Sequence, residues 1–91
     1  MLTPEPGQDP ELAARLREKV LAAISPREME FLLLASGADE YSYKQIAARM
    51  GIGEETVDGY RKSLFRKFGI RSKPGLVVFA YLWGIQPSSG H

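Results

Sequence analysis

Two glycines around one isoleucine separate two helical patterns in the middle of the chain. Before them, Ser42 and Gln45 have the spacing of a capping box, which marks the start of a helix. The apolar residues that follow recur at helical spacing and stop after about two turns, at Met50. A longer helical pattern begins at Glu54, directly after the glycine segment 51–53. A short helix, a tight turn and a longer helix together predict a helix-turn-helix arrangement.

Two more helices are predicted ahead of this unit. Residues 11–24 carry apolar residues every four positions with charges between them, which is typical of an amphipathic helix. Ser25 and Glu28 then form another capping box, with Pro26 at the first helical position, where proline is favoured. We expect this helix to end at Gly37, with the glycine in the left-handed conformation that often follows a helix.

Length and composition exclude several classes of protein. Ninety-one residues suffice for one small domain, and the absence of cysteine excludes disulfides and thiolate metal sites. The longest apolar run, residues 76–83, is far shorter than the ~20 residues that span a bilayer, and no signal peptide is apparent. We therefore expect a cytoplasmic protein without a membrane partner. The one histidine, His91, is the last residue, and no catalytic or metal-ligand pattern appears, so we expect neither an enzyme nor a bound cofactor or metal.

Charge is distributed unevenly along the chain. Residues 1–58 hold six basic and all eleven acidic residues, whereas residues 59–91 hold six basic residues and no acid. A cationic cluster beside an acidic remainder indicates a polyanion bound at one face, although a solvated face is the alternative. Glu54 and Glu55 stand in a first helical turn, where a carboxylate stabilises the helix by about 0.3–1 kcal/mol. We interpret these acids as helix-starting residues and the later cations as phosphate ligands.

The helix that begins at Glu54 has two contrasting faces. At about 100° per residue, Val57, Leu64 and Phe68 fall within one narrow sector. This sector is expected to face the core. The opposite side carries Glu55, Gly59, Lys62 and Arg66, with Asp58 and Ser63 at its margins.

Several ordered blocks closely resemble the LuxR-type (GerE-like) helix-turn-helix domain. They are "SPRE", "KQIAARMGI", "TV" and "FRKFGIRS", and the resemblance covers about residues 24–84. The "GIRSK" that follows the longer helix distinguishes this family from a related sigma-factor region. The resemblance implies an all-α fold, a four-helix bundle that inserts its third helix into the major groove of DNA, here with an additional N-terminal amphipathic helix. It also implies an output domain, since many members are output domains of two-component response regulators.

The resemblance also assigns DNA-contacting positions. In the third helix of the bundle they fall on Glu55, Thr56, Asp58, Gly59, Lys62, Ser63 and Arg66. Phosphate contacts elsewhere fall on Lys44, Arg71 and Lys73. The sequence departs from the family in three places. Asp58 replaces the usual lysine and could accept a hydrogen bond from cytosine N4. Arg61 replaces an apolar residue, so we expect its stem along the core and its head paired with an acid. The third departure is "ADEY", which lengthens the loop before the helix-turn-helix unit.

The last helical pattern, between Pro74 and Gly84, is apolar on all sides. A helix at the edge of a small bundle needs one apolar stripe, so a second apolar face requires a partner. LuxR-like domains commonly pair through this helix, which implies a weak homodimer that uses Val77, Tyr81 and Gly84. Coverage by the N-terminal helix, or by a receiver domain, is the alternative.

The expected function is sequence-specific binding of double-stranded DNA in transcription regulation, as the output domain of a response regulator. A helical protein–protein interaction module that has lost DNA binding is the alternative, suggested by Asp58 and Gly59. RNA polymerase is a further candidate partner. We divide the chain into a flexible leader, a linker helix, the DNA-binding domain and a flexible tail, at residues 1–10, 11–24, 25–85 and 86–91. No receiver domain fits before residue 24, and the leader with its helix resembles an interdomain linker, so we interpret the chain as a fragment of a longer regulator; a whole small regulator is the alternative.

Overall fold

The computed structural model describes residues 9–85, which form five helices and no strand. In chain order they are α1 (Pro10–Ala22), α2 (Pro26–Ser36), α3 (Tyr43–Met50), α4 (Glu54–Phe68) and α5 (Lys73–Leu82). The all-α prediction is confirmed. The expected flexible leader and tail fall almost entirely outside the described residues. None of the described helices is long and apolar enough to cross a membrane.

Both capping boxes are present. The Ser25 hydroxyl accepts from the Glu28 amide at 3.1 Å, and the Glu28 carboxylate accepts from the Ser25 amide at 2.9 Å. Ser42 and Gln45 repeat the arrangement at the start of α3, at 3.2 and 2.8 Å. Each box satisfies amide groups that the first turn of a helix leaves without partners, and this fixes where α2 and α3 begin.

The predicted left-handed end of α2 is wrong. Gly37 has φ −74° and ψ 166°, an extended conformation, and the positive φ occurs at Glu40, at 53°. The chain leaves α2 extended at Gly37 and reverses within the lengthened loop instead, where the Glu40 amide donates to the Gly37 carbonyl at 3.3 Å. Because the turn is made at Glu40, Gly37 does not need the left-handed conformation.

The turn between α3 and α4 follows the prediction. Gly51 has φ +69°, a left-handed conformation that suits glycine. The Ile52 amide then donates back to the Ala47 carbonyl at 3.0 Å, which closes the end of α3. α4 begins at Glu54, as predicted, with Gly53 as its cap residue.

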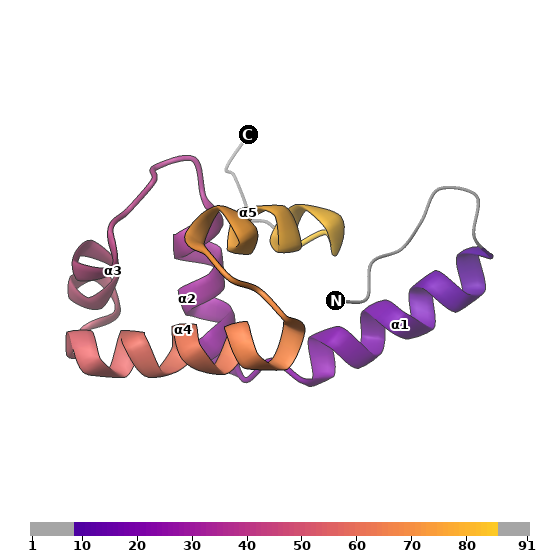
Figure 1. The fold of residues 1–91 in the computed structure, drawn as a ribbon, viewed down its shortest axis with the longest axis horizontal. Helices are drawn as coiled ribbons and strands as arrows, with labels where there is room; N and C mark the ends of the chain where they lie inside the picture. The colour runs from indigo at the N-terminus through magenta and orange to yellow at the C-terminus, as the bar shows by residue number, and fades with distance from the viewer. Residues whose placement is uncertain (1–8, 86–91) are drawn as a thin grey trace.

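Helix α2 is the centre of the bundle. It packs against α3, α4 and α5, and α3 packs in turn against α4. Figure 1 shows α2 between α4 and α5, with α3 at one end and α1 extending beyond the bundle at the other. The largest fully buried side chains come from all four bundle helices and the end of α5: Trp83, Phe31, Phe79, Leu32, Ile46, Leu64, Leu76 and Val57. This core fixes the position and rotation of α4.

Helix α1 joins the bundle through its second half. Val20 is buried, and Leu16 and Leu21 pack against the core. The Arg17 guanidinium donates to the carbonyl of Trp83 at 2.9 Å and to that of Gly84 at 3.4 Å. Arg17 thus binds free carbonyl groups at the C-terminal end of α5, where a cation is favoured.

Candidate nucleic-acid interface

Helix α4 presents one face to the core and the other to solvent. Val57 and Leu64 are buried, and Tyr60, Phe65 and Phe68 pack half-buried beside them. The exposed side carries most of the residues that the sequence assigned to it, namely Glu55, Thr56, Gly59, Lys62 and Arg66. Because these buried and half-buried residues hold α4 against the core from Val57 to Phe68, the exposed face is a rigid surface.

The first turn of α4 is acidic for a local reason. Gly53 makes no side-chain capping bond, and its helix begins with two glutamates. The Glu55 carboxylate folds back toward Gly53, where its Oε2 would lie 3.1 Å from a Cβ on that residue. A carboxylate at this place compensates the positive end of the helix. The geometry therefore supports the interpretation of Glu55 as a helix-starting residue.

Asp58 lies between two cations on α4. Its Oδ1 accepts from Arg61 Nε at 3.0 Å and from Nη2 at 2.5 Å, and its Oδ2 lies 3.0 Å from Lys62 Nζ. Hydrogen bonds from Arg61 first, and then from Lys62, lower the pKa of Asp58 below its usual value. The carboxylate is therefore ionised at neutral pH, and it holds Lys62 by an exposed ion pair.

The expected behaviour of Arg61 is confirmed. Its head pairs with Asp58, and its side chain is about three-quarters buried, at 26% exposure. The guanidinium carbon lies 5.2 Å from the ring centre of Phe65 and 5.9 Å from that of Tyr43. Arg61 is thus a packing residue of the α3–α4 contact, and its charge is not part of the exposed cationic surface.

Ser63 lies at the α2–α4 contact, not with the exposed residues. Its hydroxyl donates to Glu28 Oε2 at 2.5 Å, and the Lys67 ammonium donates to Glu28 Oε1 at 2.9 Å. Lys67 also donates to the carbonyl of Ala23 at 2.8 Å. Ser63 is half-buried, which fits its expected place at the margin of the exposed side, but its hydroxyl faces a buried carboxylate on α2.

Burial of Glu28 acts to raise its pKa, but the bonds from Lys67, the Ser25 amide and Ser63 outweigh burial and lower the pKa to about 2. The sequence analysis placed Glu28 in the capping box but missed this second role. Counting about 100° per residue places Lys67 between Tyr60 and Ser63, on the flank of α4 and away from its exposed centre. That count was the available signal that Lys67 has a partner within the protein.

Lys73 is also placed differently from the expectation. Its ammonium donates to the Tyr41 carbonyl and lies 5.4 Å from the ring centre of Tyr43, and the residue is half-buried. The bond ties the start of α5 to the lengthened loop before α3. An ammonium held in this way is not presented to a phosphate.

The remaining expected basic residues are exposed. Lys44 lies in the first turn of α3, and Arg71 lies in the turn between α4 and α5. Within residues 9–85, Lys44, Arg66 and Arg71 make no ion pair or side-chain hydrogen bond. Arg49, which the sequence analysis did not single out, stacks over the Tyr41 ring at 4.2 Å. The exposed cationic surface is therefore smaller than the sequence suggests: it consists of Lys44, Arg66 and Arg71, which have no such partner, and Lys62, which is exposed but paired with Asp58.

A family comparison accounts for this arrangement. The family model described as "Bacterial regulatory proteins, luxR family" matches residues 22–80. The chain belongs to the luxR family. The match contains α2, α3 and α4 and most of α5. Members of the luxR family are DNA-binding regulators and are not normally enzymes. Among the described residues, no group of three or more His, Cys, Asp or Glu could hold a metal ion.

Curated luxR-family relatives include proteins named "Oxygen regulatory protein NreC" from Staphylococcus aureus. Those of strains JH9, USA300 and NCTC 8325 are each 38% identical to this chain over 58 residues. The matched segment covers 63% of this chain and 25% of each relative, so the chain corresponds to about a quarter of their length. No solved structure gave a significant match.

Proposed function

We propose that this chain is a DNA-binding output domain that recognises a double-stranded sequence in transcription control, within the bacterial cytoplasm. One observation carries the proposal. The luxR-family frame holds α4 rigidly, with Lys62 and Arg66 on its solvent face and an uncharged gap at Gly59 between them and Glu55. A helix with one exposed, cationic and unobstructed face is the element that the major groove of DNA admits.

The residues of the site divide by role. Lys62 and Arg66 lie on the face of α4 that would enter the groove, and Lys44 and Arg71 lie on neighbouring elements, where they would contact phosphates. Lys62 can leave Asp58 for a phosphate at little cost, because its side chain is 66% exposed and exposed ion pairs contribute little. Thr56, exposed in the first turn of α4, offers a hydroxyl to the DNA backbone.

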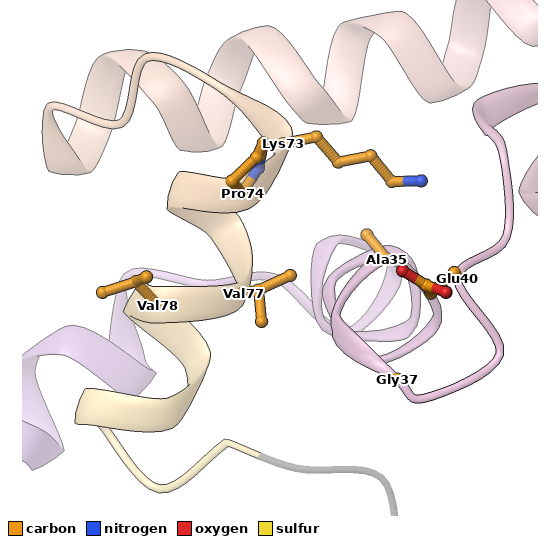
Figure 2. Close-up of a pocket in the computed structure, with 7 residues that line it drawn as sticks. All are labelled: Ala35, Gly37, Glu40, Lys73, Pro74, Val77 and Val78. Atoms are coloured by element: carbon orange, nitrogen blue, oxygen red, sulfur yellow. The ribbon is translucent and has the colours of Figure 1, made fainter.

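A second copy is the proposed partner of α5. Val77 and Tyr81 are large hydrophobic side chains, yet they are 43% and 72% exposed. Figure 2 shows Val77 opposite Ala35, at a hollow of about 400 Å³ between the end of α2 and the start of α5. α1 lies beside the end of this helix: Arg17 binds the carbonyls of Trp83 and Gly84, and Ala13 and Ala14 line a hollow together with Tyr81. A second copy would cover the part of α5 that α1 leaves exposed.

Pairing through α5 would place two copies of α4 at DNA half-sites about one helical turn apart. Since the chain corresponds to a quarter of the length of its relatives, we propose that it works within a longer response regulator, with α1 as the connection. RNA polymerase is a further proposed partner.

Selection from a random duplex pool tests the function. An enriched sequence, bound in a salt-dependent manner, is expected. If the four exposed cations Lys44, Lys62, Arg66 and Arg71 each neutralise one phosphate, log K should fall with log salt with a slope of roughly −3 to −4, at ~0.9 per phosphate. No enrichment and no salt-dependent binding would instead favour the protein-interaction module.

A further inference from the structure

Gly59 lies in the interior of α4 without any requirement from the protein. It is exposed, and a Cβ added to it would meet no atom within 4 Å. Its backbone does not require glycine either, because the glycines with positive φ among residues 9–85 are Gly51, Gly69 and Gly84. Other glycines have structural reasons: Gly51 closes α3, and a Cβ on Gly75 would lie 3.0 Å from Ile70 Cγ2.

Glycine at this place weakens the helix. It is among the least favourable residues for a helix interior, because its backbone loses the most freedom on folding. Neither packing nor dihedral angles compensate this loss within the described part of the chain. A residue that costs stability and serves no contact in the free protein points to a constraint from a bound partner.

The surroundings of Gly59 define the shape of that partner. Glu55 lies one turn before Gly59 and Lys62 lies one turn after it, and both carry long, exposed side chains. Gly59 has no side chain that would fill the space between them. Gly59 is therefore the floor of a shallow gap on the solvent face of α4. The floor offers only Cα hydrogens, since the N–H and C=O groups of a helix interior are bonded along the helix. An apolar group as small as one methyl can therefore approach the Cα of Gly59 without meeting a side chain at that position.

This inference rests on the proposed function, which places the solvent face of α4 in the major groove. The base edges there carry donors and acceptors, and the one apolar group among them is the C5-methyl of thymine. Phosphates lie at the walls of the groove, where the cations beside the gap would meet them. We propose that Gly59 receives a thymine methyl group and so makes the domain select an A·T pair at one position of its half-site.

The first test is selection from a random duplex pool with the 91-residue chain and with Gly59→Ala. The duplexes selected by the wild type should share a thymine at one position, and those selected by Gly59→Ala should not. Gly59→Ala should also melt a few degrees higher, because alanine restores the helix. Arg66→Ala is the matched control on the same face. It should bind all duplexes more weakly and still enrich the same thymine.

The second test removes the methyl group from the DNA. On the selected duplex, deoxyuridine replaces each thymine in turn, and affinity is measured for the wild type, Gly59→Ala and Gly59→Ser. One replacement should weaken the wild type about fourfold, the loss expected when one buried methyl-sized group is removed. The alanine and serine variants should lose affinity on the thymine duplex and recover part of it on that deoxyuridine duplex, where the missing methyl leaves room.

The outcomes separate this inference from the proposed function. An enriched wild-type sequence with no methyl-sensitive position, or with equal sensitivity in Gly59→Ala, would overturn the role of Gly59 and leave DNA binding intact. Failure of the wild type to enrich any duplex would overturn the proposed function, and the inference with it.

Discussion

The ammonium nitrogen of Lys67 lies 2.9 Å from Oε1 of Glu28, across the contact between α2 and α4. The Glu28 side chain is 7% exposed and that of Lys67 is 36% exposed, so the carboxylate is buried and the ammonium reaches solvent. Glu28 also caps α2 and accepts from Ser63, so one carboxylate starts one helix and fixes another. The contact holds α4 to the centre of the bundle, and it gives Lys67 a partner within the protein.

Glu28→Gln should destabilise the fold. The amide keeps the shape but loses the charge that Lys67 and Ser63 bind. We expect the free energy of unfolding to fall by about 1–3 kcal/mol, as for a hydrogen bond to a buried charged group. Urea unfolding measures it. Glu30→Gln is the matched control, because Glu30 pairs with Arg27 on the exposed side of α2 and should change stability by less than about 0.5 kcal/mol. Equal effects of the two changes would contradict the role of Glu28.

The same carboxylate predicts a pH dependence. The folded pKa of Glu28 is lowered from 4.5 to about 2. A lowered pKa means that the folded state favours the ionised form, so its contribution is fully present above pH 4.5 and is lost as the pH falls through about 2. Urea unfolding across this range measures the free energy of unfolding of the wild type and of Glu28→Gln. The excess stability of the wild type over the variant should decrease as the pH falls. A difference that stays constant between pH 4.5 and 2 would show that Glu28 does not titrate in this way.

Local features of the fold could be predicted from the sequence. The capping boxes that start at Ser25 and Ser42 are set by residues three positions apart, and the pair of Asp58 with Arg61 is set by one helical turn. The two faces of α4 followed from the period of the helix. Each of these depends on neighbours along the chain, which the sequence displays directly.

Tertiary bonds of single side chains could not be predicted in the same way. Ser63 and Lys67 bind Glu28 across 35 and 39 positions of the chain, and Lys73 binds the Tyr41 carbonyl across 32. Such partners depend on how helices dock and on the path of a loop, which no spacing rule contains. The period of the helix therefore predicts the two faces of α4, but it does not reveal that Lys67 and Lys73 have partners within the protein.

Arg71→Ala should weaken binding to all duplexes about equally. Arg71 is exposed in the turn between α4 and α5, outside the helix that would enter the groove, so it would contact a phosphate. We expect the slope of log K against log salt to flatten by roughly one unit. Titrations of selected and unrelated duplexes at several salt concentrations measure this. Lys19→Ala, which removes an exposed cation from the last turn of α1, should leave the slope unchanged. A changed sequence preference with an intact slope would instead assign Arg71 to base reading.

Asp58→Lys should raise non-specific affinity. The change removes a carboxylate that repels phosphates, releases Lys62 and adds a cation. One further phosphate contact corresponds to roughly a tenfold gain at ~0.1 M salt. Discrimination between the selected and unrelated duplexes should decrease, which competition titrations measure. Asp58→Asn, which releases Lys62 without adding charge, should give a smaller gain. Weaker binding of both variants to every duplex would show that Asp58 serves mainly to hold Arg61 in place.

Val77→Glu combined with Tyr81→Glu should abolish cooperative binding to a duplex with two half-sites. The two side chains lie one turn apart on α5, 43% and 72% exposed, so added carboxylates can stay hydrated in the monomer. In a dimer they would face their own copies, and burial of like charges opposes association. Helicity by circular dichroism and affinity for a single half-site should be unchanged, while the Hill coefficient on the double site falls to about one. Leu12→Glu is the matched control: Leu12 is also an exposed apolar side chain, at 44%, but it lies on α1 and outside α5, so cooperativity should persist. If the folded double variant still binds cooperatively, or if Leu12→Glu alone abolishes cooperativity, the pairing face is not the one that Val77 and Tyr81 define.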